Sequence, residues 1–497
     1  MQKKIVALIV FLFIFIQQSS ALSFEKLDPL GEQKTLVILY NFQNAPNDKP
    51  FTLQQVSDAL FTAPNSMNAF FKENSYGKTF FTGKIAGWYT VPFDNGPYCI
   101  DGRNDALRLA EANGIHTKDY ERWIFIHAEM PNCDPTAGEI GGNPSESSIE
   151  ASLSLYLYAH EVGHNMGLGH AHSLSCGNKS IDLYSNCNVI NYGDFLGSMG
   201  HNAGTSHLNV SQKLTMGWLD QNQVPEITQS GTYTIIPLAK NDTAVKGFRI
   251  RKYNTDEYYF IEYRQPISGT FDQNLSPTVT KGAIIHIGYF IPHGNGGEIP
   301  ETYLLDSSPP YAGDIQDVAL TEGNTFVDDI NNIRITQVSH DANSLVVNVI
   351  VPEVIPSRIE LNLGGISTAV NTASQLSALV YDQNNKPIWS SVSYEWGISS
   401  TNSIGTLIQI NGNLATFLAQ NPGSGDLWVK ATFNGQTVVK SIPVTVTTVT
   451  PSPSPIFNAL DLKTLLLKYA TNQDSLYQPR DNKVNMLDAG YVIRYLQ

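Results

Sequence analysis

The first two hundred residues alternate short apolar runs with segments of helical spacing. The run KTLVILYNF at residues 34–42 is too apolar to face water on one side, which predicts a buried strand. Residues 51–73 show helical spacing, and residues 80–91 predict a strand and hairpin. Alternating strands and helices predict an α/β sheet packed by helices over residues 22–225. Its remaining elements are expected to be a helix at 105–113, a strand at 123–128 and a helix at 152–166.

The pattern changes after residue 226. Short alternating runs such as YTIIPL, FRIRKY and GAIIHIGYF, separated by Gly, Asn and Asp, predict an all-β sandwich over residues 226–352. A second β-sandwich is predicted over residues 353–446, where Asn434-Gly435 favours a type I′ hairpin turn. The length of 497 residues also exceeds what one core can organise. The chain is therefore expected to be multidomain.

Both ends of the chain differ from these domains. Two lysines precede an apolar run at residues 5–16, and small residues follow it, so residues 1–21 predict a cleaved secretory signal peptide. The run is shorter than the roughly twenty residues that a membrane-spanning helix needs. We therefore expect a secreted, extracellular protein with no membrane span after cleavage; an uncleaved N-terminal anchor is the alternative. Residues 447–457 form a Pro/Ser/Thr linker that should be extended.

The charge balance and the cysteines indicate which partners and cross-links to expect. Acidic residues outnumber basic ones by 45 to 31, and no block of Lys and Arg stands out, so we expect no nucleic-acid partner. Four cysteines in an exported chain predict disulfides. The pairs Cys99–Cys133 and Cys176–Cys187 are favoured because each closes a local loop. Other pairings stay open, as do free thiols in a reducing environment.

Residues 160–170 carry the motif HEVGHNMGLGH. His160 and His164 lie one turn apart on the expected helix, so both imidazoles can bind one zinc ion. Gly167 can end the helix in a backbone conformation that other residues resist. The chain then turns back and brings His170 as the third ligand. Three protein nitrogens and one open position are typical of a catalytic zinc site rather than a structural one.

The chemistry expected at this motif is hydrolysis. Glu161 lies beside the helical histidines and can take a proton from a zinc-activated water as general base, then pass it to the leaving amine. His172 is an alternative third ligand. Asp194 is a candidate either to bind a ligand histidine from the second layer or to close a turn. Of the other histidines, His201 and His207 are expected in a polar surface loop, or else lining the cleft, and His127 and His286 are expected to be packed in strands.

The motif and its surroundings resemble the metzincin zinc peptidases, whose motif continues into a methionine-containing turn beneath the metal. Here YGDFLGSMG at residues 192–200 supplies that turn, with Met199 as its methionine. HNMGLGHA, YGDFLGSMG, the upstream NSYGKTFFTGKIAGWYTVP and GWL at 217–219 look most like the gametolysin family, over roughly residues 33–220. The resemblance implies an α/β catalytic domain with a zinc ion under a cleft, cleaving extracellular proteins.

The C-terminal segments resemble known modules too. Residues 353–446 look like a bacterial immunoglobulin-like domain, on their alternation, Trp396 and the hairpin. Residues 458–497 repeat NALD as NMLD at an offset of 27 and resemble a dockerin, which implies a small helical module and a cohesin-like scaffold as partner. Two positions of its calcium loop hold Tyr and Pro, so the oxygen set is incomplete and tight calcium binding is not expected. A simple capping tail is the alternative. The residues that fit calcium positions are Asp481, Asn485 and Asp488.

Three functions are consistent with these observations. The leading hypothesis is a secreted zinc metalloendopeptidase acting on proteins or peptides. The alternatives are an extracellular adhesion or scaffold-attached protein with an inactive or secondary peptidase domain, and a metal hydrolase acting on non-peptide bonds. Because a degenerate enzyme usually loses a catalytic residue, the intact Glu161 with all three histidines favours the enzyme.

Overall fold

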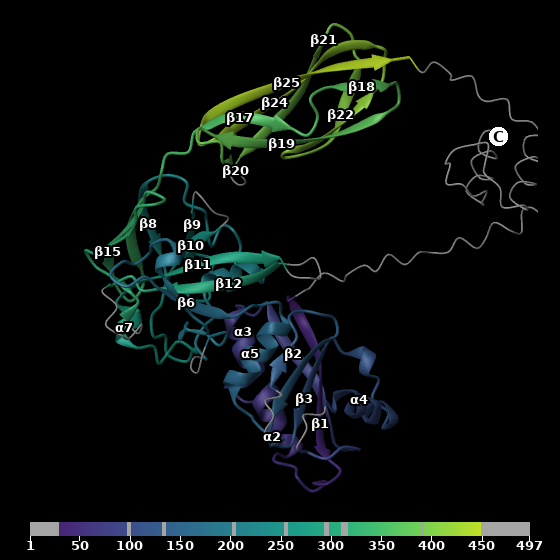
Figure 1. Cartoon of the computed structure of the whole chain (residues 1–497), viewed down its shortest axis with the longest axis vertical. Helices are drawn as coiled ribbons and strands as arrows, with labels where there is room; N and C mark the ends of the chain where they lie inside the picture. Colours follow the sequence, from purple (N-terminus) through teal and green to yellow (C-terminus); the bar gives the residue numbers. More distant parts are fainter. Residues whose placement is uncertain are drawn as a thin grey trace, which may run out of the picture. The chain divides into compact units, whose positions relative to one another are not determined.

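A computed structural model describes residues 29–96, 101–131, 136–200, 205–252, 257–292, 298–309, 317–388 and 392–448. The chain divides into two compact units, Met1–Glu353 and Val354–Gln497 (Figure 1). Among the described residues, no helix is long and apolar enough to cross a membrane. Several predicted features lie outside the described residues: the signal peptide, most of the linker, the dockerin-like tail with Asp481, Asn485 and Asp488, and also Cys99, Cys133 and His201.

The first sheet of the N-terminal unit has five strands in the order β2-β1-β3-β5-β4. Four of them are parallel, and the edge strand β4 runs antiparallel to β5. The strands are β1 (Gly31–Phe42), β2 (Thr79–Val91), β3 (Arg122–His127), β4 (Ala137–Gly138) and β5 (Ser145–Glu150).

Helices cover both faces of this sheet, which explains the unbroken apolar run in β1. One core takes Val37 and Leu39 together with residues of α3 and α5, and the other takes Leu36 and Ile38 together with residues of α4. Figure 1 shows α4 on the opposite side of the sheet from α3 and α5. A strand covered on both faces must be apolar at consecutive positions. The helices are α2 (Leu53–Ser57), α3 (Met67–Asn74), α4 (Arg103–Ala112) and α5 (Leu155–Asn165).

The helical spacing of residues 51–73 corresponds to two helices, α2 and α3, and not to one continuous helix. α2 continues into a π-helical segment, Asp58–Thr62, and the chain then leaves the helix until α3 begins at Met67. Pro64 has no backbone N–H and disfavours helical conformation in the residue before it. Ser66 then caps α3, its hydroxyl accepting a hydrogen bond from the N–H of Ala69.

The hairpin predicted within residues 80–91 is also wrong, since β2 is one strand of 13 residues. A Cβ atom on Gly83 would lie 2.1 Å from the carbonyl oxygen of Thr35, and one on Gly87 would lie 2.2 Å from that of Leu39. The two glycines therefore allow β2 to approach β1 closely rather than marking a turn.

A second sheet joins segments that the sequence analysis assigned to different domains. Its order is β7-β6-β12-β11-β10-β9, with β13 paired to β11. The first two strands precede residue 226, and β6 pairs in parallel with β12. Residues on both sides of 226 therefore belong to one compact unit. The strands are β6 (Ala171–Ser175), β7 (Asn188–Ile190), β9 (Gly247–Arg251), β10 (Tyr258–Tyr263), β11 (Gly282–Pro292), β12 (Glu298–Leu305) and β13 (Leu320–Thr321).

A third sheet, in the order β14-β15-β16-β8, shares a core with the second. Phe326 and Val347 of the third sheet belong to the same buried cluster as Ile261 and Ile285 of the second. Two sheets over one apolar core form the sandwich expected from the alternating pattern. The strands are β8 (Gly231–Ile235), β14 (Thr325–Asp328), β15 (Ile333–His340) and β16 (Leu345–Ile350), and two short helices, α6 (Val210–Thr215) and α7 (Pro277–Thr280), lie in the same unit.

The C-terminal unit contains two further sheets around a core that includes Trp396 and Phe417. Asn434 and Gly435 have φ angles of 47° and 78°, as a type I′ turn requires, and they join β24 to β25 as predicted. One sheet is β17 (Pro356–Leu361), β19 (Ala373–Asp382), β23 (Leu414–Ala419) and β22 (Gly405–Asn411), with β20 (Pro387–Ile388) beside β19; the other is β18 (Ile366–Ala369), β25 (Gln436–Thr447), β24 (Gly423–Phe433) and β21 (Ser393–Ser400).

Candidate metal centre

Helix α5 places two of the three predicted ligands and ends where the motif predicts. His160 and His164 are 7% and 5% exposed on its buried side. Gly167 follows the helix with φ of 99°, and its N–H donates to the carbonyl of His164. That left-handed conformation turns the chain back towards the helix. His170 arrives on the returning segment, just before β6.

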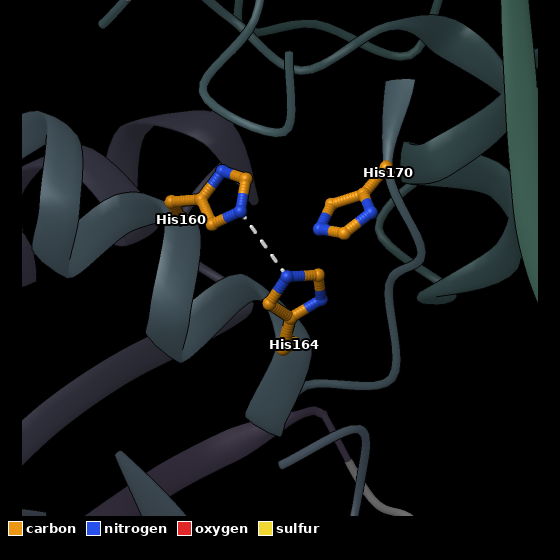
Figure 2. A group of neighbouring side chains, drawn as sticks. All are labelled: His160, His164 and His170. Carbon is orange, nitrogen blue, oxygen red and sulfur yellow. Dashed lines mark hydrogen bonds between the residues drawn. The ribbon is translucent and has the colours of Figure 1, made fainter. Parts of the chain in front are cut away.

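The three histidines converge on one point (Figure 2). One ring nitrogen from each of His160, His164 and His170 lies within 4.8 Å of the other two. The Nε2 atoms of His160 and His164 are 3.2 Å apart. Within the described part of the chain, this is the only group of three or more His, Cys, Asp or Glu residues with such spacing.

Backbone carbonyls determine which nitrogens face the centre of the cluster. Nδ1 of His160 lies 2.7 Å from the carbonyl oxygen of Ser198, and Nδ1 of His164 lies 2.8 Å from that of Leu168. A carbonyl oxygen only accepts, so each Nδ1 carries the proton and each Nε2 presents a lone pair in the neutral ring. Two lone pairs 3.2 Å apart repel each other unless a cation lies between them. The donor set therefore fits a metal ion.

Burial favours the same protonation state. It lowers the pKa of His164 to about 3 and that of His170 to about 4, and neighbouring imidazoles lower both further. Burial likewise lowers the pKa of His160 below its ordinary value. The three rings are consequently neutral near pH 7, which is the form that binds a metal ion.

Met199 packs against α5 at Gly163. It is fully buried, and a Cβ atom on Gly163 would lie only 2.4 Å from its Sδ. The carbonyl of Met199 also accepts a hydrogen bond from the N–H of Ala171, next to His170. The methionine singled out in the sequence thus packs against the motif helix, and Gly163 makes room for it.

Asp194 closes a turn and does not contact a histidine of the cluster. One carboxylate oxygen accepts from the N–H of Leu196, and the other lies 3.0 Å from Nε2 of His286. Burial alone would raise the pKa of Asp194, but His286, the Leu196 N–H and Arg264 together hold the pKa below its ordinary value. Of the two roles considered from the sequence, turn closure is the one these contacts provide.

Tyr192 is a neighbour of the cluster that the sequence analysis missed. Its ring centroid lies 4.2 Å from that of His170 and 6.1 Å from that of His160. Its N–H donates to Nδ1 of His172, whose Nε2 lies 3.7 Å from a carboxylate oxygen of Glu301. His172 is therefore engaged by other groups and lies outside the three-histidine cluster. The signal for Tyr192 was its place at the start of YGDFLGSMG.

Asn165 and Gly138 bring the edge strand β4 against α5. The side-chain amide of Asn165 donates to the carbonyls of Glu139 and Glu146, and its oxygen accepts from the hydroxyl of Ser147. A Cβ atom on Gly138 would lie 2.3 Å from the carbonyl oxygen of Glu161. β4 thus runs directly beside Glu161, whose side chain is largely buried at 6% exposure.

The prediction made for His207 is wrong, and those made for His127 and His286 are confirmed. The surface-loop assignment of His207 is wrong, because His207 is fully buried, with Nε2 2.8 Å from Glu73 and Nδ1 3.1 Å from Nζ of Lys213. His127 and His286 are fully buried in strands, as predicted.

Of the predicted disulfides, Cys176–Cys187 is present and closes the loop between β6 and β7. The other predicted pair falls on residues that the structure does not describe.

Comparisons with known proteins give only weak similarities. No family model and no curated protein matches this chain. Solved structures similar to it include the PKD domain of human KIAA0319 (TM-score 0.17, 16% identity, 20% of this chain and 89% of that one). Domains 4 and 5 of the S-layer protein SbsC match with a TM-score of 0.19 and 13% identity, over 31% and 87% of the two chains. Titin domain M7 matches with a TM-score of 0.14 and 11% identity, over 19% and 97%. At these scores the similarities carry no inference about function.

Proposed function

We propose that this chain is a secreted zinc metalloendopeptidase of the metzincin type, with an α/β catalytic domain that resembles the gametolysin family. The observation that carries the proposal is the convergence of three neutral imidazoles, two of them with Nε2 atoms 3.2 Å apart. Three protein nitrogens leave a fourth position for substrate or water. Zinc bound there would polarise the scissile carbonyl and lower the pKa of a water molecule.

Different residues bind the metal ion and transfer the proton. His160, His164 and His170 hold the metal, and the carbonyls of Ser198 and Leu168 keep two of the rings oriented. Glu161, next to His160 on α5, accepts a proton from the attacking water and delivers it to the leaving amine. The position of Glu161 in a buried stretch of helix beside the cluster supports this role.

A peptide substrate is favoured over other hydrolysable molecules by strand β4. It lies at the edge of its sheet and runs beside Glu161. An extended polypeptide that paired with β4 would therefore pass next to the proposed general base. The Cys176–Cys187 bond fits an exported protein. A cohesin-like scaffold, bound through residues 458–497, is the partner we propose for the tail.

Hydrolysis of labelled, unfolded casein by the purified chain tests the proposal. We expect activity that disappears with a zinc chelator, returns when zinc is added, and falls at least about 10²-fold in Glu161→Ala, as expected when a general base is lost. Glu129→Ala, which changes an exposed glutamate, should keep full activity. A folded, zinc-loaded wild type with no activity would contradict the proposal and favour the adhesion or scaffold-attached alternative.

A further inference from the structure

The turn at residues 194–200 links the metal cluster to the strands that follow residue 226. At one end the carbonyl of Ser198 accepts a hydrogen bond from Nδ1 of His160, and Met199 packs under Gly163. At the other end Asp194 contacts His286 at the centre of β11. The turn therefore contacts both His160 of the cluster and His286 of β11.

Contacts through Ala171 and Gly200 connect the two ends of the turn. The N–H of Asp194 donates to the carbonyl of Ala171, and the N–H of Ala171 donates back to the carbonyl of Met199. Gly200 lies so near Asp194 that a Cβ atom on the glycine would overlap the Asp194 carbonyl. A displacement of Asp194 would consequently move Ser198 and Met199 with it.

His286 holds one end of this turn from a buried position. It is fully buried in a strand hydrogen-bonded on both sides, opposite Phe260 of β10 and Leu304 of β12. Within the described residues its Nδ1 has no hydrogen-bond partner, so Asp194 is its polar contact. Well-packed apolar residues would serve stability at least as well as such a buried polar pair. Packing alone therefore does not explain why residue 286 is a histidine.

A second set of buried contacts ties the same strands to the segment that follows the turn. Arg264, directly after β10, donates to the carbonyl of His207, and Asp272 accepts from the N–H of His207. Glu262 of β10 accepts from the N–H of Val210 at the start of α6. The chain on the C-terminal side of the turn is thus held by the same sheet as Asp194.

We propose that His286 is a positioning residue for the metal cluster. Through Asp194 it fixes the 194–200 turn, and through that turn it fixes the Ser198 carbonyl that orients His160 and the methionine that supports α5. The strands after residue 226, expected from the sequence to be a separate sandwich, thereby form part of the metal centre. This inference rests on the proposed function only in that the cluster binds a metal ion.

Zinc affinity of the full-length chain, measured by competition with a chromogenic chelator, tests this role without relying on activity. We expect His286→Leu, which removes the donor to Asp194, to weaken zinc binding about tenfold or more, as outer-layer contacts of metal ligands do. His286→Gln keeps an amide donor and should recover most of that affinity.

The matched control is Tyr259→Phe. Tyr259 lies on β10, in the same sheet as His286, and the change removes its buried hydrogen bond of 2.6 Å to Asp328 on β14 of the third sheet. We expect this variant to melt at a lower temperature than wild type and to bind zinc as tightly.

The proposal is overturned if His286→Leu binds zinc as tightly as wild type, or if it loses no more affinity than Tyr259→Phe at a similar melting temperature. Should His286→Leu fail to fold, Asp194→Asn tests the same contact from its other side, and wild-type affinity in that variant would overturn the proposal. A folded wild type that binds no zinc would instead refute the proposed function, which separates the two failures.

Discussion

Backbone carbonyls orient two histidine rings of the cluster and determine which nitrogen can bind a metal ion. The motif places His160 and His164 on one face of a helix, but their Nε2 atoms face each other because Nδ1 of each ring meets a carbonyl. Those carbonyls belong to Ser198 and Leu168, which come after the helix. At the scale of single residues, the spacing of the histidines in the motif therefore brings the ligands together, and contacts with distant residues orient their rings.

Gly163 is the residue whose replacement should disturb the cluster without removing a ligand. In Gly163→Ala the new methyl group would meet Met199 Sδ at 2.4 Å, so we expect a loss of about 1–3 kcal/mol of stability from overpacking. Urea unfolding of wild type, Gly163→Ala, Met199→Ala and the double variant Gly163→Ala/Met199→Ala measures the coupling. If the methionine is the obstacle, the glycine change costs less in the Met199→Ala background than alone. Equal costs in both backgrounds would contradict this explanation.

His207 should make stability depend on pH. Its pKa lies well below the ordinary value because of burial and the positive charges of Lys213 and Arg264. The unfolded chain takes up a proton at this residue below about pH 6.5 and the folded chain does not, so stability falls as the pH falls. The His207 contribution is complete above pH 6.5 and declines by up to about 1.4 kcal/mol per pH unit below it.

Urea unfolding between pH 7.5 and 5, in wild type and His207→Gln, isolates this contribution. The other buried histidines titrate in both proteins, so the difference in slope belongs to His207. We expect the shallower dependence in the variant. Identical slopes would show that His207 is charged in the folded protein or that another group compensates.

At the scale of elements, short strands lie at the edges of the two sheets that carry the site. β4 has only two residues and β7 only three, and neither was anticipated from the hydrophobic pattern. Each is held by something outside itself: Asn165 ties β4 to α5, and the Cys176–Cys187 bond closes the loop that leads into β7. Short strands carry too few residues for alternation to be recognised.

The disulfide should stabilise this framework mainly by restricting the unfolded chain. Its partners are 11 residues apart, so we expect Cys176→Ala/Cys187→Ala to lose about 2–3 kcal/mol of unfolding free energy. Thermal and urea unfolding of the double variant, beside reduced wild type, provide the measurement. A variant as stable as the oxidised wild type would show that the loop is held by its packing alone.

At the scale of the whole molecule, the metal cluster belongs to a unit that extends to residue 353. β6 pairs with β12, and buried Glu262, Arg264 and Asp272 contact the segment around His207. Removing the later strands would expose these groups and leave β6 without its parallel partner. The C-terminal unit has a core of its own around Trp396 and Phe417.

We therefore expect a chain ending at residue 353 to fold and bind zinc, a chain ending at residue 225 to remain unfolded, and residues 354–448 to fold independently. Circular dichroism, cooperative thermal melting and zinc competition distinguish these outcomes. A folded, zinc-binding protein ending at residue 225 would contradict both this prediction and the positioning role of His286.

Features that depend on local chemistry could be predicted from the amino-acid sequence. The helix that bears His160 and His164, its end at Gly167, the buried run of β1 and the Asn434-Gly435 turn each follow from neighbouring residues. Other features became visible only in the folded protein: β2 is one strand, His207 is buried, Asp194 contacts His286, and β6 pairs with the later strands. The reason is that these features depend on contacts between residues far apart in the chain, and local patterns in the sequence do not show which distant segments meet.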